Sequence, residues 1–241
     1  MEEPAAFLEN CIPCLTRYAG YPISQSCMTK PVPLCGLSNL QLRFLCPSDL
    51  EEVRALCQDW FPIDYPYSWY EDITSNPRFY SLAAVYNGII IGLIVAEIKS
   101  YFKLNSEDRG ILSQSFSKQT EVGYILSLGV SKEHRRNGIA SLLLDNLIAH
   151  LTTIEHTDCK ALFLHVLTTN SAAIHFYEHR NFRCDSLVPA HYSIRHKNCD
   201  KFTYDECPSI RGGSCPLLRH QYLISSTIFQ QIRSQCFQNS G

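Results

Sequence analysis

The chain has 241 residues, and its 21 lysines and arginines against 23 aspartates and glutamates give a formal net charge of -2. This length suits one core domain with tails or two small domains. The near-neutral charge argues against a nucleic-acid binder, which usually carries a basic excess or stripe, and no uninterrupted apolar run reaches the ~18 residues that a membrane span needs.

The twelve cysteines raise the question of disulfides or a metal site. The acidic start Met1-Glu2-Glu3 has no basic region before an apolar stretch, so no secretory signal is expected and the thiols are predicted to be reduced in the cytosol. Cys11 and Cys14 form a tight pair, but Cys27 and Cys35 are too far from each other to supply the second pair of a zinc site. Ordinary cysteines are favoured over a metal site, and no metal is expected.

The first part of the chain predicts an irregular extension followed by a strand and two helices. Residues 1–39 mix Pro, Cys, Ser and Gly without a period, which is typical of irregular structure. Alternating apolar residues over 40–44 predict a strand. Ser48 and Glu51 match a capping box that opens a helix. Two prolines within 61–66 require a loop before a second, short helix.

The middle of the chain reads as three strands. Two β-rich runs, 79–86 and 89–98, are joined by Asn87-Gly88, a strong signal for a type I′ hairpin. A polar excursion over 100–120 separates them from a third strand at 122–130.

The last part predicts a helix, a buried strand, a second helix capped by Asn170 or Ser171, and two weaker strands. These elements are expected at residues 138–151, 161–167, 171–180, 191–195 and 202–204. Residues 206–241 lose the core pattern. They are predicted to form a tail that contains an amphipathic segment over 217–237, so the expected ordered domain spans 40–205.

The strongest motif is Arg135-Arg136-Asn137-Gly138-Ile139-Ala140, placed between a predicted strand and a predicted amphipathic helix. A glycine lets backbone N–H groups approach an anion, and a helix N-terminus supplies unpaired donors and a positive dipole. The pattern therefore predicts a phosphate-binding loop. Taken alone, it is more often an ordinary basic loop that caps a helix.

This string resembles the (Q/R)-x-x-G-x-(G/A) motif with which GNAT acetyltransferases bind the pyrophosphate of coenzyme A. A second block of that family, Asn170-x-x-Ala173-x-x-Phe176-Tyr177-Glu178-x-x-x-Phe182, follows in register. The resemblance covers about residues 40–205. It implies an α/β GNAT fold, with a central mixed, mostly antiparallel sheet flanked by helices, and acetyl-coenzyme A as the acetyl donor.

The resemblance also implies a set of cofactor-binding residues in one strand, the basic loop and the last helix. Asn170 would contact the pantetheine arm and Tyr177 the coenzyme sulfur, although a helix cap and a core aromatic are the simpler roles for these two types. The full set is Leu128, Gly129, Val130, Arg135, Arg136, Asn137, Gly138, Ile139, Ala140, Ser141, Asn170, Tyr177, Glu178, His179 and Arg180.

Two further positions match the paired general bases of the family, Tyr124 and His165. A lone histidine in an apolar run is more often a core residue with a satisfied hydrogen bond, but the resemblance favours a catalytic pair that works through ordered water. No metal takes part in that chemistry.

Several segments look like those of the branch of the family that acetylates protein N-termini, including the loop 61–66. By that resemblance Asp64, Tyr65, Leu126 and Tyr192 contact the substrate peptide; the branch usually has Glu where Asp64 stands. The expected substrates are proteins that begin with Met followed by Leu, Ile, Phe or Lys. A lysine (histone) acetyltransferase and a non-catalytic acetyl-coenzyme A-binding module are the alternatives.

The same resemblance places the protein in the cytoplasm, at the cytosolic face of the Golgi membrane. The segment 217–237 would make the peripheral membrane contact. We expect no nucleic-acid partner, and either a monomer or a homodimer.

Overall fold

The computed structural model describes residues 39–61, 63, 65–112, 119–190 and 217–224. Within them, seven strands form one sheet in the order β1-β2-β3-β4-β5-β7-β6. Neighbouring strands are antiparallel except β4 and β5, which are parallel. The strands are β1 (Leu40–Phe44), β2 (Phe79–Tyr86), β3 (Ile89–Ser100), β4 (Glu121–Val130), β5 (Cys159–Leu167), β6 (Arg183–Ala190) and β7 (Leu217–Ile224). The prediction of a mixed, mostly antiparallel sheet is confirmed.

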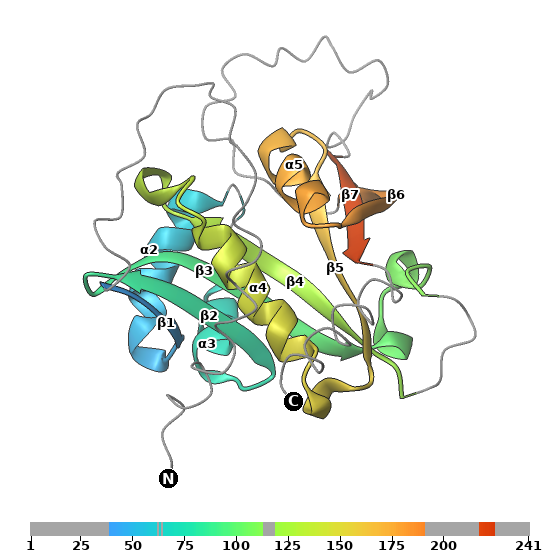
Figure 1. Ribbon diagram of the computed structural model, residues 1–241, viewed down its shortest axis with the longest axis horizontal. Helices are drawn as coiled ribbons and strands as arrows, with labels where there is room; N and C mark the ends of the chain where they lie inside the picture. The colour runs from blue at the N-terminus through green and yellow to red at the C-terminus, as the bar shows by residue number, and fades with distance from the viewer. Residues whose placement is uncertain (1–38, 62, 64, 113–118, 191–216, 225–241) are drawn as a thin grey trace, which may run out of the picture.

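Among the same described residues, four α-helices cover the two faces of this sheet, and Figure 1 shows α4 lying across one of them. They are α2 (Leu50–Trp60), α3 (Tyr67–Ser75), α4 (Ile139–Leu151) and α5 (Ser171–His179). Each matches a predicted helix. The hairpin between β2 and β3 is also confirmed, because Asn87 and Gly88 both adopt positive φ values, 51° and 80°.

Successive side chains of a strand point to opposite faces of the sheet. Both faces carry buried apolar side chains, so the sheet has a hydrophobic core on each face. One core contains α4 and α5, and the other contains α2 and α3. On α4, Leu143, Leu147 and Leu151 follow one another at intervals of four residues and are completely buried. Each such leucine stabilises the fold by roughly 1.5–3 kcal/mol, so the apolar stripe read from the sequence fixes how α4 lies on the sheet.

The start of α2 differs from the prediction. The expected capping box of Ser48 and Glu51 does not form, because Pro47 begins a 3-10 turn, η3 (Pro47–Asp49), ahead of the helix. The Asp49 carboxylate takes the capping role and accepts a hydrogen bond of 2.9 Å from the Cys46 N–H.

The C-terminal part of the sheet also differs from the prediction. Leu217–Ile224, expected to belong to an amphipathic tail outside the domain, forms β7, which inserts between β5 and β6. The tail prediction is therefore wrong for these residues. Main-chain hydrogen bonds to two neighbouring strands determine their conformation, and the segment lacks the alternating apolar pattern from which a strand could be predicted. The weak strands expected at 191–195 and 202–204 lie outside the described residues.

In the part of the chain that the structure describes, no helix is both long and apolar enough to cross a bilayer.

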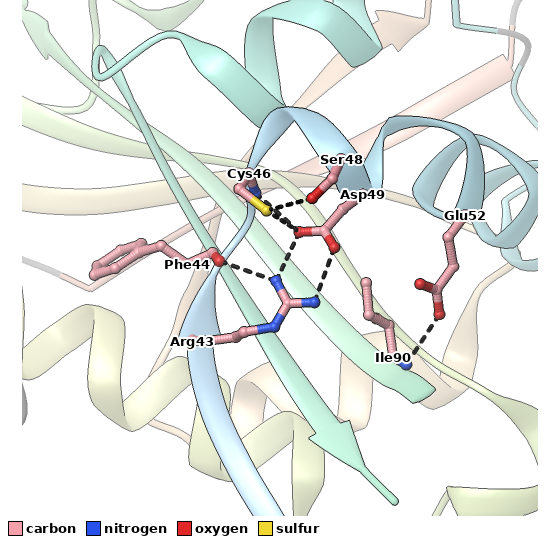
Figure 2. Close-up of polar contacts among 7 residues, drawn as sticks. All are labelled: Arg43, Phe44, Cys46, Ser48, Asp49, Glu52 and Ile90. Carbon is pink, nitrogen blue, oxygen red and sulfur yellow. Dashed lines mark hydrogen bonds and ion pairs between the residues drawn. The ribbon is translucent and has the colours of Figure 1, made fainter. Parts of the chain in front are cut away.

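A partly buried ion pair ties β1 to the turn before α2 (Figure 2). Arg43 donates through both terminal nitrogens to Asp49, at 2.6 and 2.8 Å. The Asp49 side chain is only 8% exposed, whereas that of Arg43 is 41% exposed. The hydrogen bonds from Arg43 lower the pKa of Asp49 to about 2 against the opposing effect of burial.

We expect Asp49→Asn to lower the free energy of unfolding by ~1–2 kcal/mol at neutral pH. The loss is small because Arg43 is 41% exposed, and solvent screens an ion pair with an exposed partner. Because the folded-state pKa lies below the unfolded one, the stabilisation is complete above about pH 4 and is lost as pH falls toward 2. Urea denaturation over this pH range should therefore show the two proteins converging in acid.

Glu51→Gln is the matched control, because it removes an exposed carboxylate 3.4 Å from Arg54 on the same helix. Such a pair contributes little. A constant difference between Asp49→Asn and the unmodified protein from pH 7 to pH 2 would contradict the assigned role of the ion pair.

Candidate active site

The parallel strands β4 and β5 pair over only part of their length. Their pairing runs from Glu121 opposite Cys159 to Ile125 opposite Leu164. Beyond that point β4 continues to Val130 paired with β3, and β5 continues to Leu167 paired with β7. Figure 1 shows the two ribbons separating toward α5. The second half of β4 thus has an edge to which β5 is not paired, and this edge can offer backbone N–H and C=O groups to a ligand.

A β-bulge lies where the strands part. Opposite β3, Ile125 pairs with Ala96 and Ser127 pairs with Val95, which leaves Leu126 as the extra residue. An extra residue bends the strand and disrupts its ladder locally. The predicted residues Leu126, Leu128, Gly129 and Val130 all belong to this bulged, bent half of β4.

Gly129 is required there for packing. A Cβ atom at this position would lie 2.8 Å from ring atoms of both Trp60 and Phe61, at the end of α2. The glycine therefore lets α2 approach β4 closely.

The predicted phosphate-binding loop leads directly into α4. Gly138 is the N-cap residue with φ of +80°, and Arg136 is also in the left-handed region, with φ of 66°. The Arg135 Nε donates to the Val130 carbonyl at 3.1 Å, and the Asn137 amide donates to the His134 carbonyl at 3.1 Å.

These contacts hold the loop against the end of β4, beside the first-turn residues Ile139, Ala140 and Ser141. The first N–H groups of a helix have no intrahelical partner and sit at its positive end. The arrangement fits a pyrophosphate.

The predicted residues of α5 show structural roles. The Asn170 side chain caps the helix by accepting from the Ala173 N–H at 3.2 Å. Tyr177 is buried against Phe182, with ring centroids 5.2 Å apart, and burial raises the pKa of its phenol. Arg180 forms an ion pair with Asp145 of α4. Glu178 and His179 are exposed at the end of the helix.

Tyr124 and His165 meet across β4 and β5. The Tyr124 hydroxyl lies 3.1 Å from His165 Nδ1, and the Tyr124 ring stacks on Phe163 at 4.7 Å between centroids. His165 Nε2 lies 3.1 Å from Asp108 Oδ1, and both side chains are 6% exposed. This second contact has the distance of an ion pair but lacks the alignment of a hydrogen bond.

Asp108 is the residue that sequence reasoning missed. It ends the 3-10 turn η5 (Ser106–Asp108) inside the polar excursion, where one acidic residue among many carries no signal. The only hint was indirect: a histidine in an apolar strand needs a polar partner. Nothing in the sequence identifies which carboxylate that is.

The predicted peptide contacts are partly described. Tyr65 stacks on Trp69 with ring centroids 4.0 Å apart, and its hydroxyl lies 3.2 Å from the Ser127 hydroxyl. The α2–α3 loop thereby sits on the bulged part of β4. Asp64 and Tyr192 lie outside the described residues.

Comparisons with known proteins identify the family of this chain. The model of the Acetyltransferase (GNAT) family matches residues 49–182. N-alpha-acetyltransferase 60 of Drosophila melanogaster is 56% identical in a 212-position alignment that covers 78% of this chain and 76% of that protein. The Danio rerio protein of the same name is 53% identical over 196 residues, 81% of this chain and 80% of that protein.

Among solved structures, Arabidopsis thaliana NAA60 in complex with acetyl-CoA matches 77% of this chain and 98% of its own, with a TM-score of 0.62 and 24% identity. The chain belongs to the GNAT acetyltransferase family. Within that family it belongs with the N-alpha-acetyltransferase 60 proteins.

We expect Gly138→Val to weaken acetyl-coenzyme A binding at least tenfold. A valine at φ of +80° forces the loop out of its conformation, at a cost of ~1–2 kcal/mol or more. In addition, its side chain would occupy the space in which the backbone meets a phosphate. Titration calorimetry with acetyl-coenzyme A measures the affinity.

Gly88→Val is the matched control, because Gly88 also has φ of +80° and a Cβ added there would meet nothing within 4 Å. It carries the same backbone strain in the β2–β3 turn, away from the predicted loop. Equal losses of affinity in the two variants would show that strain alone is responsible and would remove the phosphate-loop assignment.

Proposed function

We propose that the protein transfers the acetyl group of acetyl-coenzyme A to the free α-amino group of protein N-termini, mainly those that begin with Met followed by Leu, Ile, Phe or Lys. The observation that carries the proposal is the series Tyr124–His165–Asp108, placed where β4 and β5 part. The named relatives are N-alpha-acetyltransferases, which supports the α-amine as acceptor.

The series supplies a route for the proton that the amine must lose. The Asp108 carboxylate beside Nε2 can only accept, so it favours the tautomer with its proton on Nε2. His165 Nδ1 is then an acceptor for the Tyr124 hydroxyl. As the Tyr124 hydroxyl proton moves to His165 Nδ1, the Tyr124 oxygen accepts a proton from the amine or from a water that the amine has protonated.

The amine nitrogen then attacks the thioester carbonyl, the C–S bond breaks, and the leaving thiolate takes up the proton that the nitrogen loses as the amide forms. Backbone N–H groups of the bulged half of β4, around Leu128 to Val130, are the donors best placed to stabilise the oxyanion. This half of β4 is not paired with β5, so it combines open backbone groups with proximity to Tyr124.

An α-amine fits this site better than a lysine does. An α-amino group has an ordinary pKa of ~7.7–8.0, against ~10.4 for a lysine side chain, so deprotonating lysine at neutral pH costs about 3 kcal/mol more. The Tyr124–His165 contact also argues against a binding module without catalysis, which would have no need of a shielded proton route.

We expect a peptide that begins with Met-Leu and contains no lysine to be acetylated much faster than the same peptide with a blocked α-amine and one added lysine. The difference in amine pKa predicts about a hundredfold or more at pH 7.5. Product formation is measured by mass spectrometry with site assignment. Faster reaction of the blocked peptide would reverse the assignment and favour the lysine acetyltransferase.

We expect His165→Ala and Tyr124→Phe each to lower kcat by about a hundredfold or more while leaving acetyl-coenzyme A affinity nearly unchanged, since neither residue belongs to the phosphate loop. Because both act on one proton route, the double variant should lose little more than the worse single variant. Steady-state kinetics on protein whose folded fraction is verified by circular dichroism gives the three values.

Tyr80→Phe is the control for loss of a tyrosine hydroxyl from the sheet, because Tyr80 belongs to the core on the α4 face. It should keep its kcat. Activity that falls only in step with the folded fraction would mean that Tyr124 and His165 are packing residues. Fully additive losses in the double variant would mean that the two residues do not share one proton route.

The cytosolic face of the Golgi is proposed on the resemblance to the N-terminal acetyltransferases alone. Of the predicted membrane-contact segment 217–237, residues 217–224 belong to the sheet, and the proposed contact is left to residues 225–237, outside the described part of the chain. Subcellular fractionation with and without residues 225–241 decides between membrane and cytosol.

A further inference from the structure

Two histidine rings meet at the C-terminal end of α4, at the opposite end of that helix from the phosphate loop. His150 lies in the last turn of α4, and His156 ends the following 3-10 turn, η7 (Ile154–His156). Their Nε2 atoms are 3.1 Å apart. Neither residue takes part in the proposed acetyl transfer, so the contact needs its own explanation.

The connection between the two rings is firmly held. Thr153 donates to the His150 carbonyl from its N–H at 3.2 Å and from its hydroxyl at 2.9 Å. The His156 N–H donates to the Thr153 carbonyl at 3.2 Å. On its other side, the His150 ring packs on Tyr80 with centroids 4.7 Å apart. The two nitrogens are therefore positioned by the backbone and by packing.

Both rings line a cavity of about 450 Å³ between the end of α3, the start of β2 and the end of α4. Ser81 also lines this cavity, and its buried hydroxyl has no hydrogen-bond partner. An unsatisfied buried hydroxyl is uncommon and indicates room for water or a ligand. Because both rings line this cavity, a hydrated ion can reach the histidine pair from it.

We propose that His150 and His156 form a two-histidine binding site for a borderline divalent transition metal ion such as Zn²⁺. Imidazole nitrogens bind zinc at ~2.0–2.1 Å. Two of them at about 90–110° around one ion are then ~2.9–3.4 Å apart, and the observed separation of 3.1 Å falls within that range. Imidazole is a preferred ligand of zinc, copper and nickel.

The tautomers of the two rings decide whether a metal ion fits between them. When both rings are neutral, one Nε2–H faces the lone pair of the other ring; a metal ion takes that position when the donor ring carries its proton on Nδ1 instead. The carboxylate of Glu155 adds a negative charge that acts on His150 and attracts a cation.

Water from the cavity would complete the coordination. Among the described residues, no group of three or more potential metal ligands occurs, so the pair is an open, two-ligand site. Such a site links α4 to η7 and is separate from the acetyl-transfer chemistry. It is expected to bind more weakly than a closed structural zinc site.

Zinc titration calorimetry on the full chain tests the proposal, with His156→Gln as the variant. Glutamine keeps much of the size of the ring but removes the nitrogen ligand, so one zinc site should disappear or weaken about tenfold or more. His175→Gln, which removes an exposed imidazole from α5, should behave as the unmodified protein. The three proteins have the same cysteines, so zinc uptake by thiols during the titration would cancel in the difference.

Thermal unfolding provides the second measurement. Zinc should raise the Tm of the unmodified protein and of His175→Gln more than that of His156→Gln, because binding to the folded state stabilises it. If His156→Gln does not fold, His150→Gln takes its place. Equal zinc stoichiometry, affinity and Tm shift in the unmodified protein and the folded variant would overturn the proposal.

Discussion

The parting of two parallel strands is the constraint on which the rest of the site depends. β4 and β5 share a ladder as far as Ile125 and Leu164, and the extra residue Leu126 then bends β4 away. Backbone groups of the bent half are not paired with β5, whereas the paired half fixes Tyr124 beside Phe163 and within reach of His165. Open backbone for a ligand and a rigid pair of side chains therefore arise within a few residues of each other.

The polar excursion after β3 completes this arrangement. Tyr101 and Leu104 pack with Val122 and Phe163 in a third small core, and the Tyr101 hydroxyl donates to the carbonyl of Leu112 at 2.9 Å. The excursion thereby places Asp108 next to His165, with both side chains shielded from water. A buried charge acts more strongly than one at the surface. Asp108, on a loop that the sequence predicted only as a polar segment, therefore orients the His165 imidazole.

Much of the fold could be predicted because local physics determined it. The leucine stripe of α4, the Asn87-Gly88 turn and the glycine at the start of α4 each impose one conformation through burial or a positive φ. Where the predictions from the sequence were wrong, a contact that no local pattern indicates determined the conformation. Pro47 and Asp49 replaced the expected capping box, and β7 formed from a segment without a strand period because two neighbouring strands supply its hydrogen bonds.

The sequence by itself determined the order of the helices and strands as far as α5, the position of the glycine-containing loop, and Tyr124 and His165 as candidates. The order of the elements and the loop follow from periodicity and from motifs whose residues are close together in the chain. Tyr124 and His165 were candidates through the resemblance to the GNAT family. Only the tertiary structure decided that Tyr124 and His165 touch, that Asp108 joins them, and that His150 and His156 face each other. The physical reason is that side-chain contacts depend on strand register, bulges and loop paths, which the whole packed sheet sets and no local pattern encodes.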